Sequence, residues 1–238
     1  DISCVGRCSS TVALPIISAY GIECRLLPTA LLSTHTGGFT NFTYLDLTDE
    51  MRNIIQAWQE LNLHMDGIYS GFMASAELYS VFDMHFVEKM GELLPYADVL
   101  LPNITEACLL TGTPYQEGVQ SEAFIEMLIE KLQARGEKNV VLTGVMLDEK
   151  YIGAAAARST GQIDYVLAEK LPGAYHGTGD IFGSVLSAEL TNGKTLAAAT
   201  REAVDFVVKS IKNTPKSADK RYGVEFEQTL KSKRKQEQ

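Results

Sequence analysis

The segment Gly177-Thr178-Gly179-Asp180 has the residue types and spacing to hold a phosphoryl group during its transfer. It lies directly before the apolar run that begins at Ile181, an order that predicts a loop leading into a helix. The first N–H groups of a helix lack intrahelical acceptors and attract anions, and glycine lets the backbone approach a bound group. If Asp180 accepts a proton from a hydroxyl while these N–H groups hold the phosphoryl, the segment is suited to kinase chemistry.

Four further polar clusters follow predicted strands. In open α/β sheets, ligands bind beyond the carboxyl ends of the strands. Together with the glycine segment there are five clusters at equivalent positions, more than turn chemistry alone explains. The four are residues 33–38, 69–72, 103–106 and 143–144.

Each cluster also has a purely structural interpretation. Asn103 can be a helix N-cap, with Glu106 completing a capping box. Residues 143–144 can be a simple turn, His35 an ordinary loop histidine, and Asp180 a first-turn partner of the helix dipole. The two glycines that flank Thr178 favour the anion site over this last alternative.

Two competing phosphate motifs do not fit. The segment Gly193-Lys194-Thr195 resembles the end of a P-loop, but Ala188 occupies the position of that motif's first glycine. The dinucleotide fingerprint fails because Gly183 comes one position too late after Gly177 and Gly179.

The elements that must position these clusters alternate between helix-like and strand-like patterns. This alternation predicts a single α/β domain over residues 1–238, with a mainly parallel central sheet and helices on both faces. Residues 151–157 and 162–168 are expected to form an antiparallel pair. Helices are predicted at 11–20, 49–61, 83–94, 105–110, 121–135, 181–190 and 196–211, and strands at 23–32, 67–72, 99–101 and 139–144.

Composition narrows the class of protein. The 238 residues are 45% hydrophobic and 21% charged, and their net charge is −9. A general affinity for nucleic acid is therefore not expected. No apolar run reaches the length of a membrane span, and no secretory signal pattern is present. The four cysteines lack the spacing of a zinc site, which predicts reduced thiols and a cytoplasmic location.

These motifs resemble the ribokinase superfamily and, within it, the pyridoxal kinases and their hydroxymethylpyrimidine-kinase relatives. Residues 177–180 match the family's anion hole with its catalytic aspartate, and residues 103–106 match its Asn-x-x-Glu motif. Residues 32–37 resemble a pyridoxal-kinase substrate segment, and residues 1–6 are similar to the loop after the first strand. The resemblance implies a three-layer ribokinase-like fold and a homodimer.

The resemblance also implies ATP-dependent phosphorylation of the 5′-hydroxymethyl group of pyridoxal, pyridoxine or pyridoxamine. Asp180 would accept the proton, kept ionised by its helix N-terminus, and the N–H groups of Gly177, Thr178 and Gly179 would stabilise the phosphoryl. Glu106 is the expected Mg²⁺ ligand, and a monovalent cation is a further candidate cofactor. The expected substrate-facing residues are Asp1, His35, Thr36 and Phe72, and the expected ATP-binding residues are Asn103, Glu106, Thr143, Gly144, Gly177 and Gly179.

The chain departs from the family pattern in three places. The family's first strand would precede Asp1, and Leu101 replaces a frequent threonine. A helix, a strand and an Asp-Pro-Val-x-Gly-Asp loop are absent between Glu77 and Leu78, where we expect residues to be missing. Two alternatives remain: a hydroxymethylpyrimidine or hydroxymethylpyrimidine-phosphate kinase, and a nucleotide-binding regulator without catalysis. The pyrimidine kinases tend to carry cysteine at the position of Asp180, so the aspartate favours a B6 vitamer.

Overall fold

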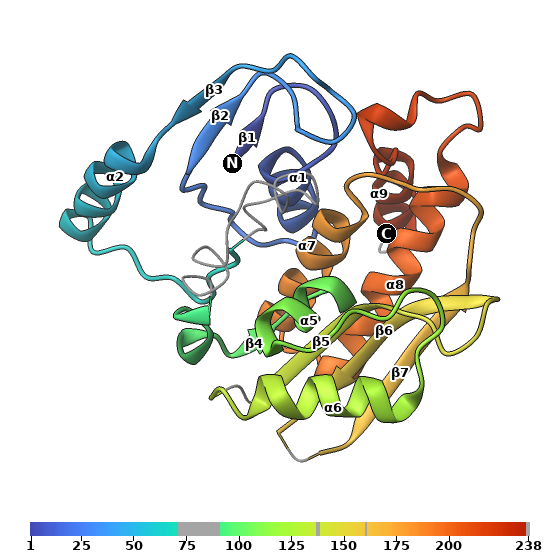
Figure 1. The fold of residues 1–238 in the computed structure, drawn as a ribbon. Helices are drawn as coiled ribbons and strands as arrows, with labels where there is room; N and C mark the ends of the chain where they lie inside the picture. Colours follow the sequence, from blue (N-terminus) through green and yellow to red (C-terminus); the bar gives the residue numbers. More distant parts are fainter. Residues whose placement is uncertain (71–90, 137–138, 160, 237–238) are drawn as a thin grey trace. The chain divides into compact units, whose positions relative to one another are not determined.

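A computed structural model describes residues 1–70, 91–136, 139–159 and 161–236 (Figure 1). The chain forms two compact units. Unit 1 comprises residues 1–77, 173–194 and 206–238, and unit 2 comprises residues 78–172 and 195–205. Each unit is described by itself below.

Unit 1 contains a small mixed sheet. Strands β1 (Ile2–Ser3) and β2 (Ala30–Leu32) pair in parallel, and β3 (Tyr44–Asp46) pairs antiparallel with β2. The expected loop at residues 1–6 is therefore partly wrong, because two of its residues form β1. The predicted strand at 23–32 is also shorter, since only its last three residues pair. Pro28, which lacks an N–H donor, precedes the paired residues.

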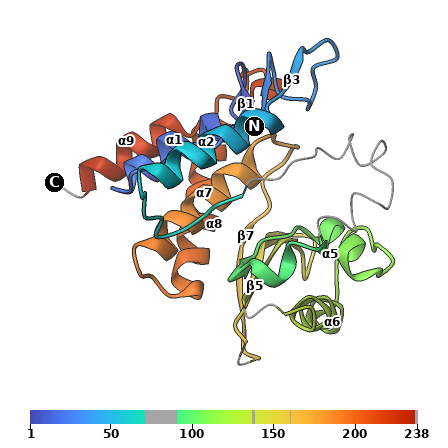
Figure 2. The same ribbon diagram turned by 90° about the vertical axis from the view of Figure 1, so that its left-hand side faces the viewer.

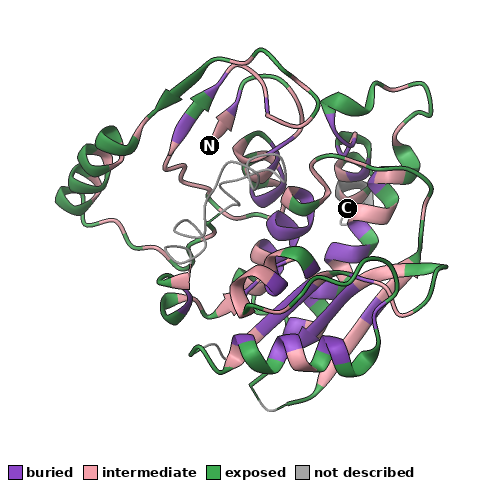
Figure 3. Ribbon diagram, in the orientation of Figure 1, coloured by how far each residue is buried: buried purple, intermediate pink, exposed green. Residues whose placement is uncertain are grey.

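Helices α1 (Ser10–Ala19), α7 (Thr178–Thr191) and α9 (Glu227–Gln236) supply the helical part of unit 1, and α8 (Leu196–Asn213) ends in it. Helices α1 and α7 pack together, and both contain buried segments (Figure 3). Their buried residues include Val12, Ile16 and Ile181. The amphipathic helix α2 (Thr48–Glu60) is also present, but none of its residues, all of them described, is buried. These helices confirm the predictions at 11–20, 49–61, 181–190 and 196–211.

Unit 2 is built on a four-stranded sheet with the order β4-β5-β6-β7. Helices α5 (Ile104–Thr111) and α6 (Glu122–Gln133) lie on one face of this sheet (Figure 2). Their apolar side chains form one core with the sheet, in which Leu128, Leu132, Val140 and Leu142 are fully buried. The strands are β4 (Val99–Leu100), β5 (Asn139–Val145), β6 (Tyr151–Ala157) and β7 (Ile163–Glu169).

Strand pairing is mixed in both units. The β4–β5 pair is parallel, whereas β5–β6 and β6–β7 are antiparallel. The antiparallel pair expected at 151–157 and 162–168 is therefore confirmed. The α/β class is also borne out, but a mainly parallel sheet in three layers and a single domain remain predictions. The described residues include no helix long and apolar enough to cross a membrane.

Several predictions fall partly or wholly outside the described residues. In the expected strand at 67–72, residues 67–70 form no regular element and the last two positions are not described. Residues 83–90 of the expected helix at 83–94 lie outside, while Gly91 is helical, residues 92–93 form a turn, and Leu94 begins the 3₁₀ helix η1 (Leu94–Tyr96). The junction between Glu77 and Leu78 also lies outside.

Candidate active site

The glycine segment of unit 1 leads into helix α7, as its sequence predicts. Gly177 is the N-cap, in a left-handed conformation with φ 78° and ψ 0°. The first intrahelical hydrogen bond runs from the Ile181 N–H to the Gly177 carbonyl, at 3.0 Å. By helix geometry, the N–H groups of Thr178, Gly179 and Asp180 precede this bond and lack an intrahelical acceptor. Asp180 is thus in the first turn of the helix rather than in the loop before it.

The two glycines of this segment have different structural roles. A Cβ on Gly177 would lie 2.1 Å from the carbonyl oxygen of Arg7, and the positive φ also disfavours a side chain there. Gly177 therefore permits close packing against residues 6–9. A Cβ on Gly179 would meet no atom within 4 Å, and its φ is ordinary. Gly179 therefore leaves open the space beside the helix N-terminus.

Asp180 is half-buried, and its carboxyl group is surrounded by enough protein to lose much of its hydration. Burial raises its pKa above the usual value, while a hydrogen bond from the Ser9 N–H acts in the opposite direction. Desolvation outweighs this stabilising hydrogen bond, so the net shift is upward. The expectation that the helix N-terminus keeps Asp180 ionised stays a prediction. A raised pKa makes the carboxylate a stronger proton acceptor.

Two ionisable side chains beside Asp180 were not among the predicted site residues. Burial, and to a smaller extent the charge of Asp180, raises the pKa of the Cys8 thiol to about 12. The same two causes raise the pKa of the Tyr69 phenol, which also hydrogen-bonds the Ser184 side chain. Both groups therefore stay protonated at neutral pH. Tyr69 lies in a cluster that the sequence singles out, whereas Cys8 carries no motif signal.

The loop at residues 33–38 packs against the residue that precedes Gly177. A Cβ on Gly37 would lie 2.8 Å from Nδ1 of His176. His35 is buried, its Nδ1 accepts a hydrogen bond from the Gly37 N–H at 3.1 Å, and its Nε2 contacts the Arg221 carbonyl at 2.5 Å. Both imidazole nitrogens are therefore engaged within the protein, which favours the loop-histidine interpretation. Thr36 is carried on the same loop.

Asp1 directly precedes β1 and lies beside Ser10, the first residue of α1. It is also close to Asp180. The Asp1 carbonyl oxygen accepts two hydrogen bonds from Ser10, one from the N–H at 3.2 Å and one from the hydroxyl at 2.5 Å. The Asp1 carboxylate accepts a hydrogen bond from the Ser3 hydroxyl at 3.2 Å. Unit 1 thus brings Asp1 and Asp180 together, as the resemblance implies. Phe72 lies outside the described residues.

The predicted nucleotide residues of unit 2 also meet. Asn103 and Glu106 form a reciprocal capping box at the start of α5, with both hydrogen bonds at 2.9 Å. This confirms the structural interpretation of that cluster. An isolated parallel bridge joins Asn103 to Thr143, whose N–H donates to the Pro102 carbonyl at 2.9 Å. Gly144 has φ 75° at an irregularity inside β5, so residues 143–144 belong to a strand rather than a turn.

The donor set of this cluster suits Mg²⁺ only in company with other ligands. Carboxylate and amide oxygens are the hard donors that Mg²⁺ takes. However, Oε2 of Glu106 and Oδ1 of Asn103 already accept backbone hydrogen bonds. Among the residues that the structure describes, no group of three His, Cys, Asp or Glu side chains is placed to hold a metal. The cluster therefore fits an ion held mainly by phosphate oxygens and water.

Comparison with known proteins identifies the family to which this chain is similar. A family profile described as phosphomethylpyrimidine kinase matches residues 48–225. The crystal structure of a candidate phosphomethylpyrimidine kinase from Bacteroides thetaiotaomicron is 32% identical, with a TM-score of 0.91 over 98% of this chain and 91% of that chain. Its orthorhombic form with pyridoxal is 31% identical, with a TM-score of 0.88 over 98% and 92% of the two chains. Lactobacillus plantarum pyridoxal kinase is also 31% identical, with a TM-score of 0.85 over 98% and 93%.

A curated relative gives the same family. The hydroxymethylpyrimidine/phosphomethylpyrimidine kinase of Haemophilus influenzae is 32% identical over 124 residues, which are 50% of this chain and 45% of that protein. The chain spans about half the length of the curated relatives it matches. The fold is that of the ribokinase-like α/β proteins. Within that class, the chain belongs to the phosphomethylpyrimidine kinase family.

Proposed function

We propose that this protein is an ATP-dependent kinase that phosphorylates a hydroxymethyl group on a small aromatic nitrogen heterocycle. The observation that carries the proposal is the half-buried, desolvated carboxyl group of Asp180 in the first turn of α7. A desolvated carboxylate beside backbone N–H groups that lack intrahelical acceptors combines a proton acceptor with an anion site.

In the proposed reaction, Asp180 accepts the proton of the substrate hydroxyl as that oxygen attacks the γ-phosphorus of ATP. The raised pKa of Asp180 increases its proton affinity as the new P–O bond forms. The N–H groups at residues 177–179 donate to the oxygens of the transferring phosphoryl group. Cys8 and Tyr69 stay protonated and add no negative charge near the reacting phosphate.

Residues of unit 2 are proposed to bind the nucleotide. Asn103, Glu106, Thr143 and Gly144 come together there, and the capping box fixes the first two. Mg²⁺, when bound, would neutralise charge on the ATP phosphates. Glu106 would orient that ion directly or through water.

We propose a B6 vitamer as the acceptor: pyridoxal, pyridoxine or pyridoxamine. The aspartate at position 180, where pyrimidine kinases tend to carry cysteine, supports this choice. So does the similarity to L. plantarum pyridoxal kinase and to the B. thetaiotaomicron structure with pyridoxal. Asp1, Thr36 and Phe72 are the proposed substrate-facing residues, whereas His35, whose two ring nitrogens contact Gly37 and Arg221, is proposed only to hold their loop in place. Thr34 supports a substrate-binding role for the loop at residues 33–38, because its hydroxyl is buried without a hydrogen-bond partner among the described residues and could accept one from a ligand.

A second candidate acceptor is hydroxymethylpyrimidine or its phosphate. The matching family profile and the H. influenzae relative both carry that activity in their names. A coupled assay of ADP release, run with pyridoxal and hydroxymethylpyrimidine side by side, decides between the two. Faster turnover of the pyrimidine would overturn the vitamer assignment.

The same assay tests the assignment of Asp180. Asp180→Asn should abolish turnover with either acceptor while retaining nucleotide binding, measured by fluorescence of a labelled ATP analogue. A variant with near-normal turnover would remove Asp180 from the mechanism. If the wild type binds nucleotide but phosphorylates neither acceptor, the result would instead support a nucleotide-binding regulator without catalysis.

We also propose a homodimer and a cytoplasmic location. Leu31 and Leu45 lie opposite each other in the β2–β3 pair and are 37% and 56% exposed, so they offer an apolar face to a second copy. Light scattering of the purified protein should give twice the chain mass, and Leu31→Lys with Leu45→Lys should lower it. The four cysteines are free thiols, which supports the cytoplasmic location.

A further inference from the structure

Residues 6–9, which carry none of the predicted site residues, lie against the N-terminus of α7. The Arg7 carbonyl occupies the space that a side chain on Gly177 would take. The Cys8 sulfur lies 3.6 Å from the same Cβ position. The Ser9 N–H donates a hydrogen bond to the Asp180 carboxylate. This segment therefore forms one wall around the proposed proton acceptor.

Ser9 holds an unusual backbone conformation in that wall. Its φ of 55° and ψ of −135° lie in a region that residues with a side chain rarely adopt. Besides Ser9, Asn62 is the other residue with a side chain and a positive φ among those described. Such a conformation persists only where surrounding contacts impose it. Its result here is to direct the Ser9 N–H toward Asp180.

The contacts that hold this segment come from the C-terminal part of unit 1. The Arg7 N–H donates to the Tyr222 carbonyl at 2.9 Å. The Arg7 side chain donates from Nε to Glu227 at 2.7 Å, and its Nη2 lies 3.9 Å from Glu225. Gly223 allows this approach, since a Cβ there would lie 2.9 Å from the Arg7 carbonyl oxygen.

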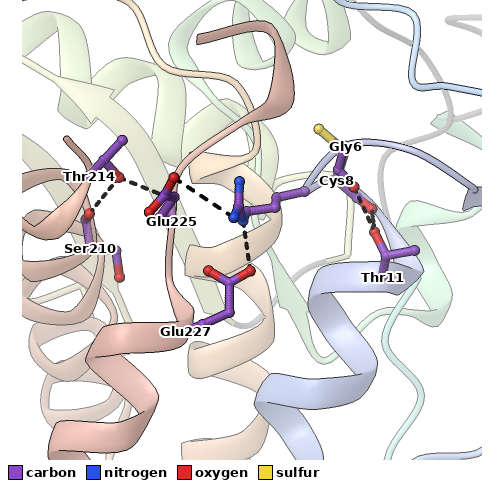
Figure 4. A network of polar contacts seen from close by, with 8 residues as sticks. Gly6, Cys8, Thr11, Ser210, Thr214, Glu225 and Glu227 are labelled. Carbon is purple, nitrogen blue, oxygen red and sulfur yellow. Dashed lines mark hydrogen bonds and ion pairs between the residues drawn. The ribbon is translucent and has the colours of Figure 1, made fainter. Parts of the chain in front are cut away.

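Residues 222–227 are themselves fixed to two other elements. The Glu225 N–H donates to the Thr214 hydroxyl at 2.9 Å, and that hydroxyl donates to the Ser210 carbonyl of α8 at 2.8 Å (Figure 4). The Val224 N–H donates to the His176 carbonyl at 3.3 Å, directly before Gly177. The same short segment thus contacts both Arg7 and the residue directly before Gly177.

We propose that Arg7, through its ion pairs with Glu225 and Glu227, positions residues 6–9 so that the Ser9 N–H holds the Asp180 carboxylate. Arg7 is a positioning residue, because its side chain pairs with the C-terminal segment. The inference rests on the proposed function, in which Asp180 accepts the substrate proton. It extends the site to residues 222–227.

The proposal predicts a change in the titration of Asp180. The described groups that face this carboxyl are the Ser9 N–H, the Cys8 thiol and the Tyr69 phenol. The Ser9 hydrogen bond stabilises the ionised form. Loss of that bond should therefore raise the pKa of Asp180 and move the acidic limb of kcat to higher pH. A general loss of stability would not produce this shift.

The test compares Arg7→Met with Arg52→Met. Arg52 forms an ion pair of the same length, 2.7 Å, with Asp49 on α2, so it is a matched control. Asp180 is followed by carbon-13 NMR of aspartate-labelled protein and identified by its absence in Asp180→Asn. Arg7→Met should raise the Asp180 midpoint by roughly half a pH unit, the size expected for one hydrogen bond, and lower kcat about threefold to tenfold. Arg52→Met should change neither.

A charge exchange completes the test. The double variant Arg7→Glu with Glu227→Arg should recover most of the midpoint and of kcat, whereas each single change should not. The same midpoint in Arg7→Met and wild type, or no recovery in the exchange, would overturn the proposal. Should Arg7→Met fail to fold, Glu227→Gln provides the same comparison with both arginines intact. The NMR midpoint needs no turnover, so a wild type inactive on every acceptor would count against the proposed function alone.

Discussion

Replacing the two glycines of the α7 N-terminus by alanine should have opposite consequences. Gly177→Ala places a Cβ 2.1 Å from the Arg7 carbonyl oxygen at a positive φ, so the backbone must move. Gly179→Ala places a Cβ in open space at an ordinary helical position. The first change should therefore act on stability, and the second on the space available to a phosphoryl group.

The expected magnitudes follow from these geometries. A left-handed conformation costs a residue with a side chain about 1–2 kcal/mol, and overpacking costs about 1–3 kcal/mol more. Gly177→Ala should thus lower the free energy of unfolding by about 2–5 kcal/mol, equivalent to a fall in Tm of about 4–20 °C. Gly179→Ala should raise stability by up to about 1 kcal/mol, because alanine is the better helix former. Its methyl group stands in the way of the phosphoryl, so kcat should fall about tenfold to a hundredfold.

Thermal unfolding and the coupled ADP assay, run on both variants and the wild type, measure these effects. Gly112→Ala is a suitable control, since Gly112 also has a positive φ but its Cβ would meet nothing within 4 Å. It should cost only the conformational part, about 1–2 kcal/mol. Full activity in Gly179→Ala would refute the role of this N-terminus as a phosphoryl site. An unchanged Tm in Gly177→Ala would refute the packing of residues 6–9 against it.

Three further predictions concern the ionisable groups. Because burial raises the pKa of Asp180, its ionised form opposes folding. Asp180→Asn should therefore raise the free energy of unfolding at neutral pH. This gain should disappear as the pH falls and the wild-type carboxyl becomes protonated. Urea unfolding at several pH values measures it, and an equal gain at every pH would contradict the prediction. Asn103→Ala should lower the free energy of unfolding by about 1 kcal/mol, because the α5 cap is lost. Glu106→Gln should keep the cap but raise the Mg²⁺ concentration that activity requires. An unchanged Mg²⁺ requirement would remove Glu106 from the metal site. Calorimetry should detect no Mg²⁺ binding to the protein alone and clear binding with an ATP analogue; tight binding without nucleotide would indicate a preformed metal centre.

The features of the site that sequence predicts are those that depend on neighbouring residues. The capping box of Asn103 and Glu106, three residues apart, and the glycine loop before α7 are fixed by local hydrogen bonding and φ preferences. The direction of the Asp180 pKa shift is not local. It depends on how far residues 1–10 and Tyr69 enclose the carboxyl, and no spacing within residues 177–180 contains that information.

Arg7 shows the same limit more clearly. Its partner Glu227 is 220 positions away, and both are ordinary charged residues in sequence. The irregular parts of the sheets were equally hard to predict. Strand β1 has only two residues, too few for an alternating pattern, and Gly144 occupies a β-strand irregularity that resembles a turn in sequence.

The contact between Arg7 and residues 222–227 has a consequence for synthesis of the chain. A ribosome makes residues 222–227 more than two hundred codons after residues 6–9. The early segment therefore waits, with its unfavourable Ser9 conformation unsupported, until the late one emerges. Contacts so distant in sequence form slowly, since the entropy of closing the loop is lost before they contribute. Assembly of the Asp180 pocket should be one of the last events in folding, and nascent chains that stop before Glu225 should lack it.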